Sequence, residues 1–151
     1  EEDPIEIWIC SPGGGLAFAY AIYDTMQAIP CPVHTIGIGN VYSAATLLLT
    51  AGAKGGRFLM PNARVMLHAI QYADLGGWNS QPELAVIAEE GKSQQKILVD
   101  IISKHSKLSI TEVQALMNRN MDKYLSAHQA IKLGLADRII RPDKSKVVKK
   151  L

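Results

Sequence analysis

Short apolar runs alternate with turn residues along the first half of the chain. The runs at 5–10 (IEIWIC) and 33–38 (VHTIGI) are rich in β-branched and aromatic residues, which predicts two buried strands. Between them, apolar residues at helical spacing predict a helix over 16–29, which Pro30 ends. A strand, a helix and a strand in this order indicate a crossover connection and a largely parallel sheet.

The same alternation continues after the second strand. Gly39 and Asn40 predict a turn, and the small residues of 43–53 predict a helix that Gly52 ends. Two further short strands are expected at 57–60 and 64–68.

Helical patterns dominate the second half. A long helix is expected over 81–105, with Gly91 interrupting it. Two capping boxes open later helices, which are Ser109 with Glu112 and Ser126 with Gln129. A last short strand is expected at 137–140.

No repeat or linker divides this pattern. We therefore expect a single domain over residues 1–141, followed by a basic C-terminal tail over 142–151. Because the chain starts almost directly in a strand, we also expect an N-terminal segment to be missing.

Composition narrows the function classes. Among 151 residues, 48% are apolar and 20% charged, and the net charge of +2 argues against a dedicated nucleic-acid binder. Cys10 and Cys31 form no disulfide framework, which fits a reducing compartment. The mostly apolar stretch at 41–53 is too short to span a bilayer. No two histidines have metal-ligand spacing, so we expect no metal and no cofactor.

The glycine loop at 11–15 (SPGGG) lies between the first strand and the first helix. Amide groups at a helix start can stabilise a phosphate or a reaction oxyanion, although a plain tight turn explains the glycines equally well. A dinucleotide fingerprint fails here because Phe18 occupies the place of its third glycine, and no Walker A motif occurs.

Three polar residues are candidates for catalysis, and each has a simpler structural explanation. Ser43 begins a predicted helix, where a serine commonly serves as the N-cap. His68 ends a predicted strand, where a histidine is commonly structural. Asp122 lies in a polar segment, as an ordinary surface carboxylate would. The flanking residues Val41 and Ala45 exclude the G-x-S-x-G elbow of α/β-hydrolases.

Six stretches, in order, resemble the proteolytic subunit of the Clp protease, ClpP. They are SPGG at 11–14, AIYDTMQ at 21–27, AGAKGGRF at 51–58, PNARVMLH at 61–68, YLSAHQA at 124–130 and LGLAD at 133–137. The resemblance runs from about residue 5 to residue 140. It implies a crotonase-like α/β fold with repeated β-β-α units and a projecting handle helix, for which 81–105 is the candidate.

The resemblance also assigns roles, residue by residue. It implies a serine endopeptidase in which Ser43 is the nucleophile, His68 the general base and Asp122 the acid that orients it. The oxyanion hole falls on the backbone N–H groups of Gly14 and Ala44. The residues that the resemblance places along the substrate groove are Gly13, Ala69, Ile70, Gly76 and Gly77.

Assembly and partners follow from the same resemblance. Such subunits form heptameric rings that stack as a tetradecamer, and a Clp-type AAA+ unfoldase feeds unfolded polypeptide into the chamber. The expected location is the cytoplasm of a bacterium, or a plastid or mitochondrial matrix. No nucleic-acid or membrane partner is expected.

The chain departs from the family pattern beside the candidate site. Ala69 and Ile70 stand where the family usually has Gln-Pro, and Ala44-Ala45-Thr46 stands for Met-Gly-Ala. These changes leave open a catalytically impaired paralogue that acts as a structural ring subunit. They also leave open whether the ring forms from this chain alone or together with a paralogue. A crotonase-type acyl-CoA enzyme is a third alternative.

Overall fold

The computed structural model describes residues 3–71, 80–117 and 121–141. The strands within these residues are β1 (Ile5–Ser11), β2 (Val33–Tyr42), β3 (Arg57–Leu59), β4 (Arg64–Leu67), β5 (Lys123–Ser126) and β6 (Arg138–Ile139). The helices are α1 (Leu16–Ala28), α2 (Ala44–Thr50), α3 (Gln81–His105), α4 (Ile110–Met117) and α5 (Ala127–Lys132). The predicted mixed α/β organisation is therefore confirmed.

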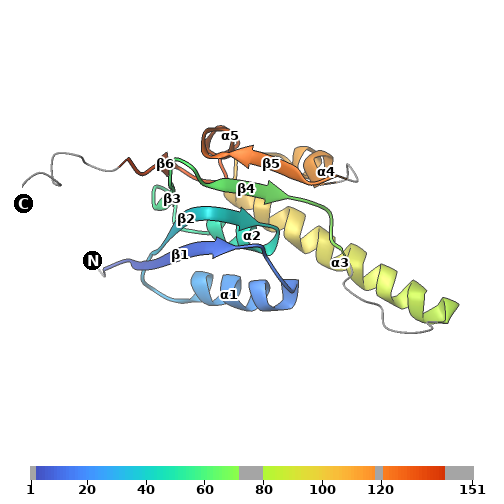
Figure 1. The fold of residues 1–151 in the computed structure, drawn as a ribbon. Helices are drawn as coiled ribbons and strands as arrows, with labels where there is room; N and C mark the ends of the chain where they lie inside the picture. The colour runs from blue at the N-terminus through green and yellow to red at the C-terminus, as the bar shows by residue number, and fades with distance from the viewer. Residues whose placement is uncertain (1–2, 72–79, 118–120, 142–151) are drawn as a thin grey trace, which may run out of the picture.

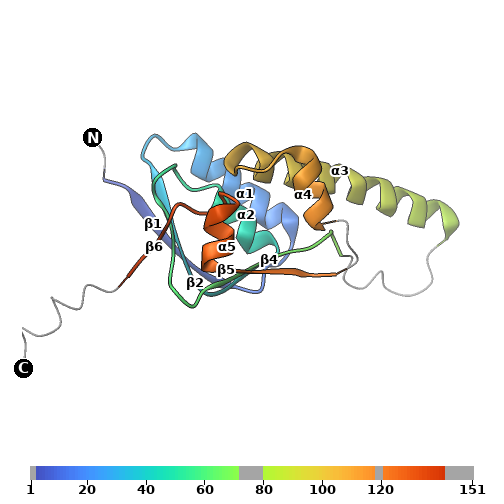
Figure 2. The same ribbon diagram turned by 90° about the horizontal axis from the view of Figure 1, so that it is seen from above.

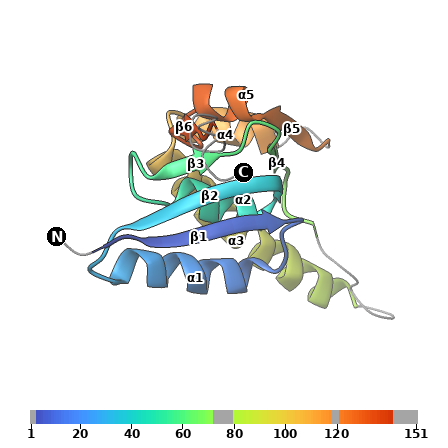
Figure 3. The ribbon, with the colours of Figure 1, turned by 60° about the vertical axis from the view of Figure 1, so that its left-hand side comes forward.

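Strand β2 is the centre of the sheet (Figure 3). One of its edges pairs with β1, while the opposite edge pairs first with β3 and then with β4. These pairings are parallel, as the crossover connections predict. Strand β5 adds to β4 in the antiparallel direction and was not predicted.

Helices α1, α2 and α3 pack on one face of the sheet, as Figures 1 and 2 show. The core between the sheet and these helices includes five residues with 0% exposure, which are Val41, Leu47, Leu59, Val65 and Ile102. Apart from Gly91, the buried residues of helix α3 lie in its C-terminal half, and its N-terminal half extends past the sheet (Figure 1). The sequence therefore predicted both the position and the projection of this helix correctly.

Two glycine-based predictions were wrong. Gly39 does not turn the chain: it has a φ of 57° inside β2, where the pairing with β1 shifts from Ile9–Gly37 to Ser11–Val41. This is a bulge, which a glycine with positive φ accommodates within a continuing strand. Gly91 does not interrupt α3, which runs over 25 residues without a break.

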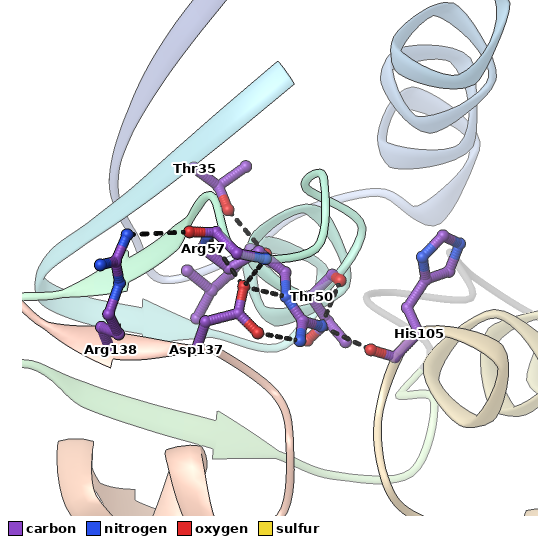
Figure 4. A network of polar contacts seen from close by, with 8 residues as sticks. Thr35, Thr50, Arg57, His105, Asp137 and Arg138 are labelled. Atoms are coloured by element: carbon purple, nitrogen blue, oxygen red, sulfur yellow. Dashed lines mark hydrogen bonds and ion pairs between the residues drawn. The ribbon is translucent and has the colours of Figure 1, made fainter. Parts of the chain in front are cut away.

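The buried Arg57 side chain pairs with the partly buried Asp137 and joins the end of α3 to the sheet (Figure 4). The guanidinium of Arg57 binds the Asp137 carboxylate through Nε at 3.0 Å and Nη2 at 2.6 Å. It also donates to the carbonyl oxygens of Thr50 and His105. Since these partners lie on α2, α3 and the segment before β6, this one side chain fixes the relative positions of three elements.

Candidate active site

Ser43 lies in the tight connection between β2 and α2. Its φ of 54° is the only positive value at a non-glycine residue in the described part of the chain. The backbone is held there because Ser43 N donates to the Met66 carbonyl at 2.9 Å, and the Thr46 hydroxyl donates to the same carbonyl at 2.9 Å. Ser43 occupies the N-cap position of α2 as expected, but its side chain makes no capping hydrogen bond, so capping does not explain the hydroxyl. Such strain is typical of functional positions and costs about 1–3 kcal/mol.

His68 follows the last residue of β4 and lies directly beside Ser43. Its Nε2 atom is 2.7 Å from the Ser43 Oγ atom. Its Nδ1 atom is buried and has no hydrogen-bond partner among the residues that the structure describes. A buried ring nitrogen without a partner is costly. In the imidazolium, and in the neutral tautomer whose Nε2 can accept the Ser43 proton, Nδ1 carries a proton and needs a hydrogen-bond acceptor.

Asp122 lies opposite His68 in the continuation of the β4–β5 pairing, but its carboxylate makes no hydrogen bond to the imidazole ring. The last antiparallel pair between β4 and β5 joins Leu67 to Lys123, so His68 and Asp122 occupy the next position of each chain. The Asp122 carboxylate is exposed and accepts a hydrogen bond from the Tyr124 hydroxyl at 3.1 Å. That hydrogen bond raises the pKa of the Tyr124 phenol. The structure therefore brings Ser43 and His68 together and leaves Asp122 adjacent.

The glycine loop lies against the serine. Gly13 has a φ of 103°, and a Cβ atom built on it would lie 2.7 Å from the Ser43 Cβ and 2.8 Å from the Tyr42 carbonyl oxygen. The amides of Gly14 and Ala44 donate no hydrogen bond to any residue within 3–71, 80–117 or 121–141. Two free amides beside a serine can receive the oxygen of a bound carbonyl group.

The close contact at Gly13 gives a first prediction. Gly13→Ala is expected to lower kcat/KM for peptide cleavage by about 10²-fold, because the new methyl group must displace Ser43 from His68. Gly55→Ala is the matched control, since Gly55 also has a positive φ, of 85°, but open space around its Cβ position. Equal activity of the two variants in a steady-state assay would contradict the proposed role of this contact.

A pocket of about 750 Å³ opens beside Ser43 and His68. Two of the predicted groove residues, Ala69 and Ile70, line it, and the Ile70 amide donates to the Gln95 side chain of α3 at 2.9 Å. Gly76 and Gly77, also predicted for the groove, lie outside the described residues. The sequence did not identify the wall that α3 and α4 contribute, which includes Val86, Gly91, Gln94, Leu98 and Met117. The sequence signal that could have identified this wall is the helical spacing of its α3 residues, which places them on one face of the helix.

No group of three or more His, Cys, Asp or Glu side chains within the described residues is arranged to hold a metal ion. None of the described helices is long and apolar enough to cross a membrane.

Comparison with known proteins agrees with this geometry. The model of the Clp protease family matches residues 1–143. The chain is 40% identical over 149 residues to an ATP-dependent Clp protease proteolytic subunit of Dehalococcoides mccartyi, covering 96% of this chain and 72% of that protein. It is 36% identical over 142 residues to the ATP-dependent Clp protease proteolytic subunit 2 of Rhodococcus jostii, covering 92% and 70%. A similar subunit 2 of Nocardia farcinica is 37% identical over 142 residues.

Proposed function

Because the chain belongs to the Clp protease family, whose members are serine peptidases, we propose that Ser43 is the nucleophile of a serine endopeptidase and His68 its general base. The observation that carries this proposal is the distance of 2.7 Å between His68 Nε2 and Ser43 Oγ. A histidine at hydrogen-bond distance can take the serine proton as the hydroxyl attacks a carbonyl carbon.

The remaining steps use the groups around this pair. The Gly14 and Ala44 amides receive the oxyanion of the tetrahedral intermediate, and His68 then gives its proton to the leaving amine as the C–N bond breaks. A water molecule, deprotonated by His68, hydrolyses the resulting serine ester and restores the Ser43 hydroxyl. Asp122 accepts a hydrogen bond from the Nδ1–H group of His68, which fixes the tautomer and stabilises the imidazolium. For this role the carboxylate turns from the Tyr124 hydroxyl to the buried Nδ1 atom of His68, the residue that follows the last β4–β5 pair, Leu67 with Lys123.

The role of Asp122 gives a second prediction. Asp122→Asn is expected to lower kcat by at least ~10²-fold, because an amide cannot stabilise the imidazolium and can hold the wrong tautomer. Tyr124→Phe is the matched variant: it removes the competing hydroxyl and keeps the ring that packs on Tyr42 at 5.4 Å. Its activity is expected to equal or exceed that of the wild type. Near-normal turnover by Asp122→Asn would remove Asp122 from the mechanism.

At the level of assembly, we propose that residues 1–141 form one peptidase domain that works within stacked heptameric rings, a tetradecamer. The relatives are named as subunits of an ATP-dependent protease, which supports a Clp-type AAA+ unfoldase as partner and unfolded polypeptide as substrate. No cofactor is needed by the peptidase chemistry. The bacterial relatives favour a bacterial cytoplasm, with a plastid or mitochondrial matrix as the other proposed location.

The proposed function is tested by comparing two substrates. The purified oligomer should cleave a short fluorogenic peptide by itself, and should degrade an unfolded protein only when a Clp-type unfoldase and ATP are added. The alternative of a catalytically impaired structural subunit predicts that a folded oligomer cleaves neither substrate. The names of the relatives do not favour that alternative, and no described feature favours an acyl-CoA enzyme.

A further inference from the structure

The chain leaves the sheet at the candidate general base. Strand β4 pairs with β2 as far as Met66 and with β5 as far as Leu67. Residues 68–71 belong to no strand or helix. The sheet therefore fixes the backbone on the N-terminal side of His68, whereas the backbone that follows needs other partners for its N–H and C=O groups.

A side chain of α3 supplies one such partner. The Ile70 N–H group donates to the Gln95 Oε1 atom at 2.9 Å, and both residues are half-buried. No other side chain in the part of the chain that the structure describes bonds to the backbone of 69–71. Proline, which stands at the place of Ile70 in the family pattern, has no N–H group to donate. The contact is therefore a feature of this chain's own sequence.

Gln95 is itself held in place by two neighbouring helices. Its Nε2 atom donates to the sulfur of the buried Met117, at the end of α4, at 3.6 Å. The carbonyl oxygen of the adjacent Gln94 accepts a hydrogen bond from the Tyr20 hydroxyl of α1 at 2.7 Å. Burial raises the pKa of Tyr20 to about 12, so this hydroxyl keeps its proton at neutral pH. This turn of α3 is thus tied to both α1 and α4, and the Gln95 side chain can serve as a fixed anchor.

We propose that Gln95 is a positioning residue, which holds the chain after His68 and so keeps the imidazole at hydrogen-bond distance from Ser43. Only Ala69 separates the anchored Ile70 from the base, so a shift of that backbone moves the imidazole as well. A misplacement of about 1 Å in a catalytic group can cost about 10²-fold in rate. Gln95 itself touches no reacting atom. This inference rests on the proposed function, since His68 has to be the general base.

The test removes the acceptor and keeps the length of the side chain. Gln95→Met is expected to lower kcat for a fluorogenic peptide by about 10-fold and to change KM by less than about threefold. The rate at which a small fluorophosphonate labels Ser43 should fall by the same factor, because this reaction needs the imidazole but no bound peptide. Gln95→Glu keeps an oxygen acceptor and should retain at least about half of both rates. Gln114→Met makes the same replacement at an exposed position of α4 and should change neither rate.

A second measurement separates this hydrogen bond from the other contacts of Gln95. Ile70→Pro removes the N–H group. Adding Gln95→Met to Ile70→Pro should therefore lower the labelling rate by less than about twofold, because the bond is already absent. Gln95→Ala removes the same acceptor without its bulk, and it replaces Gln95→Met in both measurements should that variant not assemble.

The outcomes distinguish this inference from the proposed function. A folded Gln95→Met oligomer that is labelled at the wild-type rate overturns the role of Gln95 and leaves the proposed function intact. An equal loss in Gln95→Glu, or the same loss in the presence of Ile70→Pro, also overturns it, because neither loss would depend on the hydrogen bond. A wild type that is not labelled at Ser43 and cleaves no peptide overturns the proposed function and this inference together.

Discussion

Ser43→Ala is expected to lower peptide hydrolysis by at least ~10³-fold, because it removes the hydroxyl that lies 2.7 Å from His68 Nε2. The fold should be unaffected, since the Ser43 side chain makes no capping bond and the strained backbone is held by its amide and by Thr46. The measurement is the initial rate on a fluorogenic peptide, with circular dichroism to verify folding.

The controls for this variant follow from the same geometry. Ser93→Ala changes an exposed serine on α3 and should retain full activity. His68→Ala should lose about as much activity as Ser43→Ala, and the double variant no more, because groups that act as a unit are not additive. Additive losses, or a Ser43→Ala enzyme with wild-type rates, would show that the two residues do not act together.

Asp137→Ala is expected to destabilise the fold by about 3 kcal/mol, because it leaves the Arg57 guanidinium buried without its counter-ion. The Arg57 side chain is only 6% exposed, and its remaining partners are carbonyl oxygens of Thr50 and His105. The free energy of unfolding in urea measures the loss. Glu89→Ala breaks the exposed pair with Lys92 and should change stability by less than ~0.5 kcal/mol. Equal effects would contradict the structural role of the buried pair.

The same ion pair predicts a pH dependence. Burial alone would raise the pKa of the Asp137 carboxyl, but hydrogen bonds and the charge of Arg57 outweigh it, so this pKa lies below its ordinary value of 3.8. A lowered pKa in the folded state means that the pair stabilises the fold fully above pH 3.8 and less as pH falls through the folded-state pKa. The wild type should therefore lose more stability below pH 3.8 than Asp137→Ala does.

The parts of this fold that sequence predicts well are those fixed by neighbours along the chain. The capping boxes at Ser109 and Ser126 form as expected, because each needs only a side chain three residues away. Strand β1 and helix α1 begin where the apolar pattern and the glycine loop place them. Ser43 and His68, which lie 2.7 Å apart, were singled out together with Asp122 only through their joint fit to an ordered set of motifs.

The parts that sequence missed depend on contacts between distant segments. Strand β5 has only four residues, and its pairing with β4 rather than its own pattern makes it a strand. Gly39 and Asn40 predicted a turn because glycine occurs both in turns and in β-bulges, and the local sequence does not distinguish the two. The hydrogen bond between the Tyr124 hydroxyl and the Asp122 carboxylate was also missed. It needs an extended backbone, which places side chains two residues apart on the same face, and the pairing of β5 provides it.

The most direct test of this account is to treat the purified oligomer with a fluorophosphonate, which reacts covalently with activated serines, and to locate the adduct by peptide mass spectrometry. The account predicts a single adduct on Ser43, and its loss in His68→Ala, because the hydroxyl is reactive only beside the imidazole. A folded oligomer that remains unlabelled, or is labelled at another serine, would contradict it.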